Sequence, residues 1–150
     1  MKKALPCVMV CVTEQTRCEN LIRAGRRLAD DLGVELEVLN IQPVRNAFKA
    51  RSDELQYLFN TVKANGAGMT VYYNDDAALI AAGHIRKCNA VSVVTGLPAT
   101  NGSNFVEMVR TLVPDVQINL TEDNGRVHPL YPTEQKNVEL ARLRAIASVT

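Results

Sequence analysis

The fold is decided by residues 6–12, which read Pro-Cys-Val-Met-Val-Cys-Val. A near-continuous apolar run of this length is typical of a strand that is buried on both faces of a parallel sheet. Thr16 then stands three positions before Glu19, the spacing of a capping box, and Gly33 supplies a stop for the helix that would follow. Residues 34–41 alternate apolar and polar side chains, which predicts a second strand. The first third of the chain therefore predicts most of a βαβ unit.

The same alternation continues to residue 120. Further helices are expected at 52–65, 77–88 and 104–113, and further strands at 69–73, 91–95 and 116–120. Strands that alternate with helices of this length imply right-handed crossovers. The sequence therefore predicts an α/β fold with a doubly wound, five-stranded parallel sheet in the order 3-2-1-4-5.

The C-terminal part of the chain departs from this pattern. We expect residues 1–121 to form the α/β domain and residues 122–150 to form an extension that contains a helix from Glu134 to about Ala147. A thin apolar stripe on that helix would dock on its own domain or on a partner subunit. A frayed terminal helix is the alternative.

Composition excludes several classes of protein. The 150 residues carry 17 basic and 16 acidic side chains, so no global field attracts nucleic acid or an anionic membrane. No stretch approaches the roughly 18 apolar residues of a membrane span, and the N-terminus lacks the cleavage site of a signal peptide. We expect a soluble, cytoplasmic protein with reduced cysteines, in which Cys18 is the thiol placed at an exposed helix start and His84 and His128 lie on the surface.

Two predicted loops meet where the strand order reverses, between the first and fourth strands. One follows residue 12 and the other spans residues 96–103. Glycines in the second loop let backbone N–H groups approach an anion, and the next helix contributes a positive N-terminus. We expect a phosphate as the ligand of this loop. The alternative is that the loop binds nothing and its residues only connect the strand to the helix and cap that helix. The candidate nucleotide- or anion-binding residues are Thr13, Glu14, Gly96, Gly102, Ser103 and Asn104.

The sequence lacks the motifs of several other kinds of functional site. The glycines are followed by no P-loop lysine, no Gly-x-Gly-x-x-Gly opens the first helix, and the nucleophile elbow and zinc motifs are missing. We expect no metal site and no enzyme. A slow nucleotide hydrolase is the enzymatic alternative, with Glu14 as the nearby carboxylate that would act as a general base.

The opening of the chain resembles that of universal stress proteins. Residues 8–13 read Val-Met-Val-Cys-Val-Thr, and residues 21–41 read Leu-Ile-Arg-Ala-Gly-Arg-Arg-Leu-Ala-Asp-Asp-Leu-Gly-Val-Glu-Leu-Glu-Val-Leu-Asn-Ile. The closest likeness is to the stress-protein-like module of potassium-responsive sensor kinases, and the layout agrees through Leu120. The resemblance implies an adenine-nucleotide alpha-hydrolase-like fold, a regulatory or stress-linked role, a homodimer, and ATP or another adenine nucleotide as ligand.

The nucleotide-binding pattern of that family is Gly-x2-Gly-x9-Gly-Ser/Thr, and this chain departs from it. Gly96 matches the first glycine, Ala99 stands at the second, and Gly102 with Ser103 follows after two residues instead of nine. Thr13 stands where family members that bind ATP carry an aspartate. The sequence thus favours a regulatory binding module with a degenerate adenine-nucleotide or anion site. The alternative is a protein-interaction or dimerisation subunit without a small ligand, which associates through the terminal helix and the fifth strand or binds a regulatory protein.

Overall fold

The computed structural model describes residues 5–12, 18–48, 52–97 and 104–130. The elements in chain order are β1 (Cys7–Val12), α1 (Glu19–Leu32), β2 (Glu35–Gln42), the 3-10 helix η2 (Val44–Phe48), α2 (Ser52–Ala64), β3 (Gly68–Tyr73), α3 (Ala77–Lys87), β4 (Ala90–Gly96), α4 (Phe105–Leu112), β5 (Gln117–Thr121) and β6 (Val127–Leu130). Within this part of the chain, no helix is long and apolar enough to cross a membrane.

The strands form one sheet in the order β3-β2-β1-β4-β5-β6. The first five strands pair in parallel, as the sequence predicts, and β6 pairs antiparallel with β5. The predicted number of five strands is therefore wrong. The mostly parallel α/β architecture and the order of its first five strands are confirmed.

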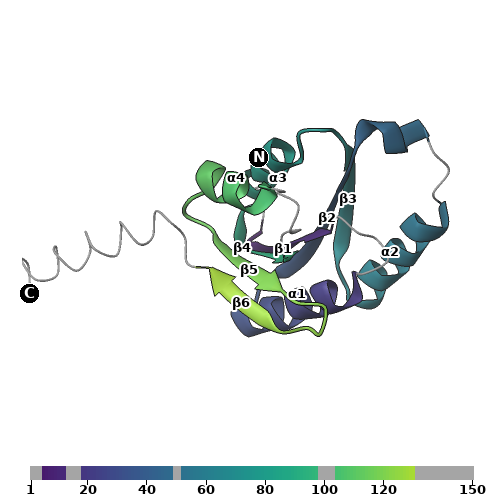
Figure 1. Ribbon diagram of the computed structural model, residues 1–150. Coiled ribbons are helices and arrows are strands. Elements are labelled where there is room, and N and C mark those ends of the chain that lie inside the picture. The colour runs from purple at the N-terminus through teal and green to yellow at the C-terminus, as the bar shows by residue number, and fades with distance from the viewer. Residues whose placement is uncertain (1–4, 13–17, 49–51, 98–103, 131–150) are drawn as a thin grey trace, which may run out of the picture.

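Helices cover both faces of the sheet, with α1 and α2 on one side and α3 and α4 on the other (Figure 1). Every residue of β1 is buried, because this strand is central and both of its faces are covered. Side chains of a strand alternate between faces, so Met9 packs in the core beneath α3 and α4 while Val8 and Val10 pack beneath α1 and α2.

Helix α1 approaches β1 closely at Gly25. A Cβ atom at this position would lie 2.3 Å from Val10 Cγ2 and 3.1 Å from Leu36 Cδ1. Glycine is therefore required by space rather than by backbone conformation. The helix ends at Gly33, which has φ of +68° and thus confirms the predicted stop.

The sixth strand belongs to a hairpin in the stretch where we expected an extension. Gly125 has φ of +89° in the turn, the Glu122 N–H donates to Arg126 O at 2.8 Å, and the Arg126 N–H donates to Asn124 Oδ1 at 2.9 Å. A three-residue hairpin loop of this kind ends with a residue in the left-handed conformation, which glycine adopts readily. The turn folds Val127–Leu130 back on β5. The expected helix at 134–147 lies outside the described residues.

The register of the hairpin determines which backbone groups of β6 face outward, away from β5. Glu122 and Arg126 form a hydrogen-bonded pair, and such pairs alternate with non-bonded ones along an antiparallel ladder. Asn119 and Pro129 fall on a non-bonded position, so the Pro129 nitrogen points away from β5. A proline there removes an outward N–H, which blunts the edge against further strands.

Candidate functional site

The strand order reverses between β1 and β4, as predicted. From β1 the chain passes to α1 on one face, and from β4 it passes to α4 on the opposite face. The carboxyl ends of these two neighbouring strands, Val12 and Gly96, therefore lie side by side where the connections diverge. This is the position at which open α/β sheets bind ligands.

Two of the six predicted site residues are among the described ones. Gly96 ends β4, and Asn104 is the N-cap of α4. The helix begins at Phe105, one residue later than predicted, so Asn104 is its N-cap. The Asn104 side chain is exposed and makes no hydrogen bond to the first turn, so this residue does not cap the N–H groups there. Thr13, Glu14, Gly102 and Ser103 lie outside the described residues.

A chain of three amides, two of them buried, runs along the carboxyl end of β2 toward this point. Asn46 Nδ2 donates to Gln42 Oε1 at 2.9 Å, Gln42 Nε2 donates to Asn40 Oδ1 at 3.1 Å, and Asn40 Nδ2 donates to the Val12 carbonyl at 2.7 Å. Asn40 is fully buried and Gln42 is 8 % exposed. Because buried amides are stable only when their hydrogen bonds are made, this chain fixes the last carbonyl of β1.

These amides were not predicted, although the sequence carries a signal for them. Asn40 and Gln42 continue the apolar positions Leu36 and Val38 on one face of β2. A polar residue at a core-facing position indicates a buried polar network or a site, because its desolvation must be compensated.

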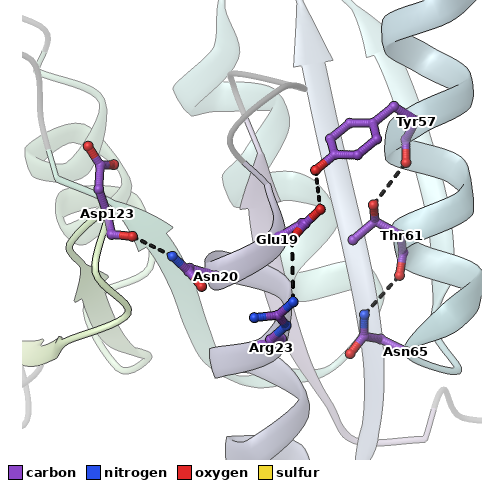
Figure 2. Close-up of polar contacts among 7 residues, drawn as sticks. All are labelled: Glu19, Asn20, Arg23, Tyr57, Thr61, Asn65 and Asp123. Carbon is purple, nitrogen blue, oxygen red and sulfur yellow. Dashed lines mark hydrogen bonds and ion pairs between the residues drawn. The ribbon is translucent and has the colours of Figure 1, made fainter.

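The first turn of α1 is held on both sides, as Figure 2 shows. The Tyr57 hydroxyl on α2 donates to the Glu19 carboxylate, and Arg23 Nη2 donates to the same carboxylate at 3.3 Å. On the opposite side, Asn20 Nδ2 donates to the Asp123 carbonyl in the turn between β5 and β6 (Figure 2). The connection from β1 to α1, which contains Thr13 and Glu14, is therefore anchored at Val12 and again at the start of α1.

Cys18 is not the exposed thiol that the sequence led us to expect. It is the N-cap residue of α1 and has no exposed surface. Burial raises the pKa of the Cys18 thiol, and a hydrogen bond with Thr61 opposes this effect. Cys18 is thus a core residue, and the cap position falls there rather than at Thr16.

A buried hydroxyl lies on the same edge of the sheet. Thr121 ends β5 beside Gly96, is 2 % exposed, and its Oγ1 has no hydrogen-bond partner among the described residues. An unpaired buried hydroxyl is costly, so such groups are often found where a ligand supplies the missing partner. Among the described histidine, cysteine and acidic side chains, no group of three could hold a metal ion.

Comparison with known proteins identifies the fold. No protein-family model and no curated protein matches this chain. A universal stress protein from Archaeoglobus fulgidus superimposes with a TM-score of 0.55 at 15% identity, covering 79% of this chain and 92% of that one. The universal stress protein from the same organism in complex with dAMP superimposes with a TM-score of 0.50 at 16% identity, covering 69% of this chain and 87% of that one. A conserved protein from Thermus thermophilus superimposes with a TM-score of 0.55 at 12% identity, covering 82% of this chain and 67% of that one. The chain has the fold of universal stress proteins.

Proposed function

We propose that this chain is a universal-stress-protein-like, non-enzymatic regulatory module of the cytoplasm. In this proposal it binds an adenine nucleotide or another anion at the carboxyl edge of the sheet, between β1 and β4. The observation that carries the proposal is the reversal of strand order at Val12 and Gly96, because this is where sheets of this topology bind ligands. A neighbour of the same fold was solved with dAMP, which supports an adenine nucleotide as the first ligand to test.

The chemistry of the described residues at this edge is compatible with a nucleotide. The first turn of α4 has no side-chain cap from Asn104, so its N–H groups are available to a phosphate. The hydroxyl of Thr121 is a buried group that still requires a partner. In the proposed site, Gly102 and Ser103 contribute backbone and hydroxyl donors, and Thr13 and Glu14 line the opposite loop.

The hairpin changes which surfaces a protein-interaction subunit could use. We expected association through the fifth strand, but β5 is paired with β4 on one side and β6 on the other. A homodimer or a complex with a regulatory protein would therefore use other surfaces.

Calorimetric titration of the purified protein, stripped of any ligand carried over from expression, tests the proposal. ATP with Mg²⁺ and dAMP are titrated separately into the wild type and into a Gly102→Val, Ser103→Ala double variant. We expect micromolar binding that the double variant abolishes, because a valine side chain would block close approach of the backbone and alanine lacks the hydroxyl.

Thr111→Ala is the matched control. It removes a hydroxyl at the other end of α4, where the Thr111 Oγ1 donates to the Glu107 carbonyl at 2.9 Å. This variant should bind as the wild type does. Absence of heat with either nucleotide up to millimolar concentration would refute the nucleotide site and favour the alternative without a small ligand.

A further inference from the structure

A second constellation of side chains lies beneath α3, on the face of the sheet away from α1. His84 and Cys88 are four residues apart, and Cys88 Sγ lies 3.3 Å from His84 Nε2. The other ring nitrogen, His84 Nδ1, lies 3.1 Å from the hydroxyl of Tyr72 on β3. A thiol, an imidazole and a group that orients the imidazole are thus connected in one line.

The structure contradicts the expectation that His84 is a surface residue. The residue is 7 % exposed, and its ring meets that of Tyr72 edge-on, with centroids 5.4 Å apart and planes at 75°. Packing on one side and two polar partners on the others hold the ring in a single orientation. Cys88, in contrast, is partly exposed and can be reached from solvent.

From this arrangement we propose that Cys88 is a nucleophilic thiol and a site of covalent modification by small-molecule disulfides. His84 acts as its general base and Tyr72 as the positioning residue of that base. A nucleophile within hydrogen-bond reach of a base, which is itself oriented by a third group, is the recurring arrangement of activated thiols.

The reaction is a thiol–disulfide exchange. Cys88 Sγ attacks one sulfur of the disulfide, a new sulfur–sulfur bond forms, and the old one breaks to release one thiolate. The thiol proton passes to His84 Nε2 and then to the released thiolate or to solvent. In the reactive tautomer His84 Nδ1 carries its proton and donates it in a hydrogen bond to Tyr72 Oη, which leaves Nε2 free to accept the thiol proton.

The surroundings favour this neutral resting pair. Burial lowers the pKa of His84, and Lys87 on α3 lowers it further. Burial raises the pKa of Cys88, and Glu37 on β2 adds to this effect while Lys87 opposes it. On β1, the Cys7 Sγ donates to the Cys88 carbonyl at 3.5 Å. The imidazole is therefore unprotonated near neutral pH, which is the state that a general base requires.

The other three cysteines provide internal controls. Cys7, Cys11 and Cys18 are 1 %, 4 % and 0 % exposed, and burial raises the pKa of Cys7 and of Cys11 to about 12. These thiols should react only when the protein unfolds. One thiol per chain should consequently react in the native protein.

The test uses the aromatic disulfide dithiobis-nitrobenzoate, whose released thiolate is followed by absorbance, on the full chain under native conditions. We expect one thiolate released per chain in a single fast phase, with the adduct mapped to Cys88 by mass spectrometry. Cys88→Ser should abolish that phase. An adduct that maps to another cysteine, or absence of reaction without denaturant, would overturn the proposal, and neither measurement depends on a variant that folds poorly.

The role of His84 is tested by His84→Gln, which keeps a hydrogen-bonding side chain but no base. We expect the exchange rate to fall by about 100-fold, the lower end of what a positioned base contributes. Tyr72→Phe should slow the reaction less and shift the midpoint of its pH–rate profile, an effect that loss of packing alone would not produce. An unchanged rate in His84→Gln, with native circular dichroism, would refute the assignment of the base.

Discussion

Replacement of Asn40 by alanine should destabilise the fold and weaken the proposed site together. The side chain is fully buried and, among the described residues, donates to the Val12 carbonyl at 2.7 Å and accepts from Gln42 Nε2 at 3.1 Å. A typical buried hydrogen bond contributes about 1 kcal/mol, and a buried partner left unpaired costs about 1–3 kcal/mol. Loss of both bonds should therefore lower the free energy of unfolding by about 2–4 kcal/mol.

Urea denaturation followed by circular dichroism measures this change, and the slope of the transition should remain that of the wild type. Calorimetric titration with an adenine nucleotide then measures the effect on the site. Because the Asn40 amide holds the end of β1, we expect affinity to fall by at least about tenfold, which corresponds to about 1.4 kcal/mol of binding free energy.

Asn119→Ala is the matched control for this experiment. Asn119 is 5 % exposed and donates to Ser92 Oγ at 2.8 Å and to the Val93 carbonyl at 2.9 Å, so the same substitution again removes two buried bonds. Its amide does not hold the end of β1. Similar destabilisation by both variants, with affinity lost only in Asn40→Ala, is the expected result. A change below about 0.5 kcal/mol in Asn40→Ala, or equal affinity in the two variants, would show that the amide chain does not position the site.

Three further predictions concern the scaffold. Gly25→Ala should destabilise the protein, because overpacking against Val10 Cγ2 costs about 1–3 kcal/mol and outweighs the gain of up to about 1 kcal/mol in helix propensity. In Gly83→Ala on α3 an added Cβ meets nothing within 4 Å, so this variant should stabilise; a higher urea midpoint for both would contradict the packing argument. Glu37→Gln should be more stable than the wild type at neutral pH. Burial and Glu35 raise the pKa of Glu37 in the folded protein, so the stability linked to its protonated form is present below the ordinary pKa of 4.5 and is lost as the pH rises. If the urea midpoints of the variant and the wild type differ by the same amount at neutral pH and at about pH 4, this prediction is refuted. Pro129→Val should restore an outward N–H on β6 and promote self-association in concentration-dependent light scattering, whereas an unchanged mass would mean that this edge is protected in another way.

The sequence predicted the parts of the fold that depend on local pattern. The apolar run of β1 and the left-handed glycine after α1 are both recognisable from a few consecutive residues. Strand β6 escaped prediction because it is short, mostly exposed and contains a proline. It is stabilised by pairing with β5 and by the turn at Gly125, both of which lie outside residues 127–130.

The place of the candidate site was predictable because it follows from topology, but its side chains were not. Asn40 and Gln42 act through partners on β1 and η2, and these contacts exist only after the sheet has formed. The same holds for His84. Its spacing from Cys88 is present in the sequence, yet only the packing of α3 against β3 brings Tyr72 to the other ring nitrogen.

The proposed nucleotide site and the proposed reactive thiol lie at opposite ends of the same strands. Cys7, whose Sγ contacts the Cys88 carbonyl, begins β1, and Val12 ends it. Five residue steps along a strand span about 17 Å, so an adduct on Cys88 cannot reach a ligand at the far edge. Coupling would pass through the strands that join the two edges, such as β1, which is fully buried, or β3, where Tyr72 lies in register with Ile41, between Asn40 and Gln42 of β2. If nucleotide affinity changes when Cys88 is modified but not when it is replaced by serine, the adduct must displace these strands. If the unmodified wild type, the modified protein and the Cys88→Ser variant all bind nucleotide equally well, the two sites on this fold are independent.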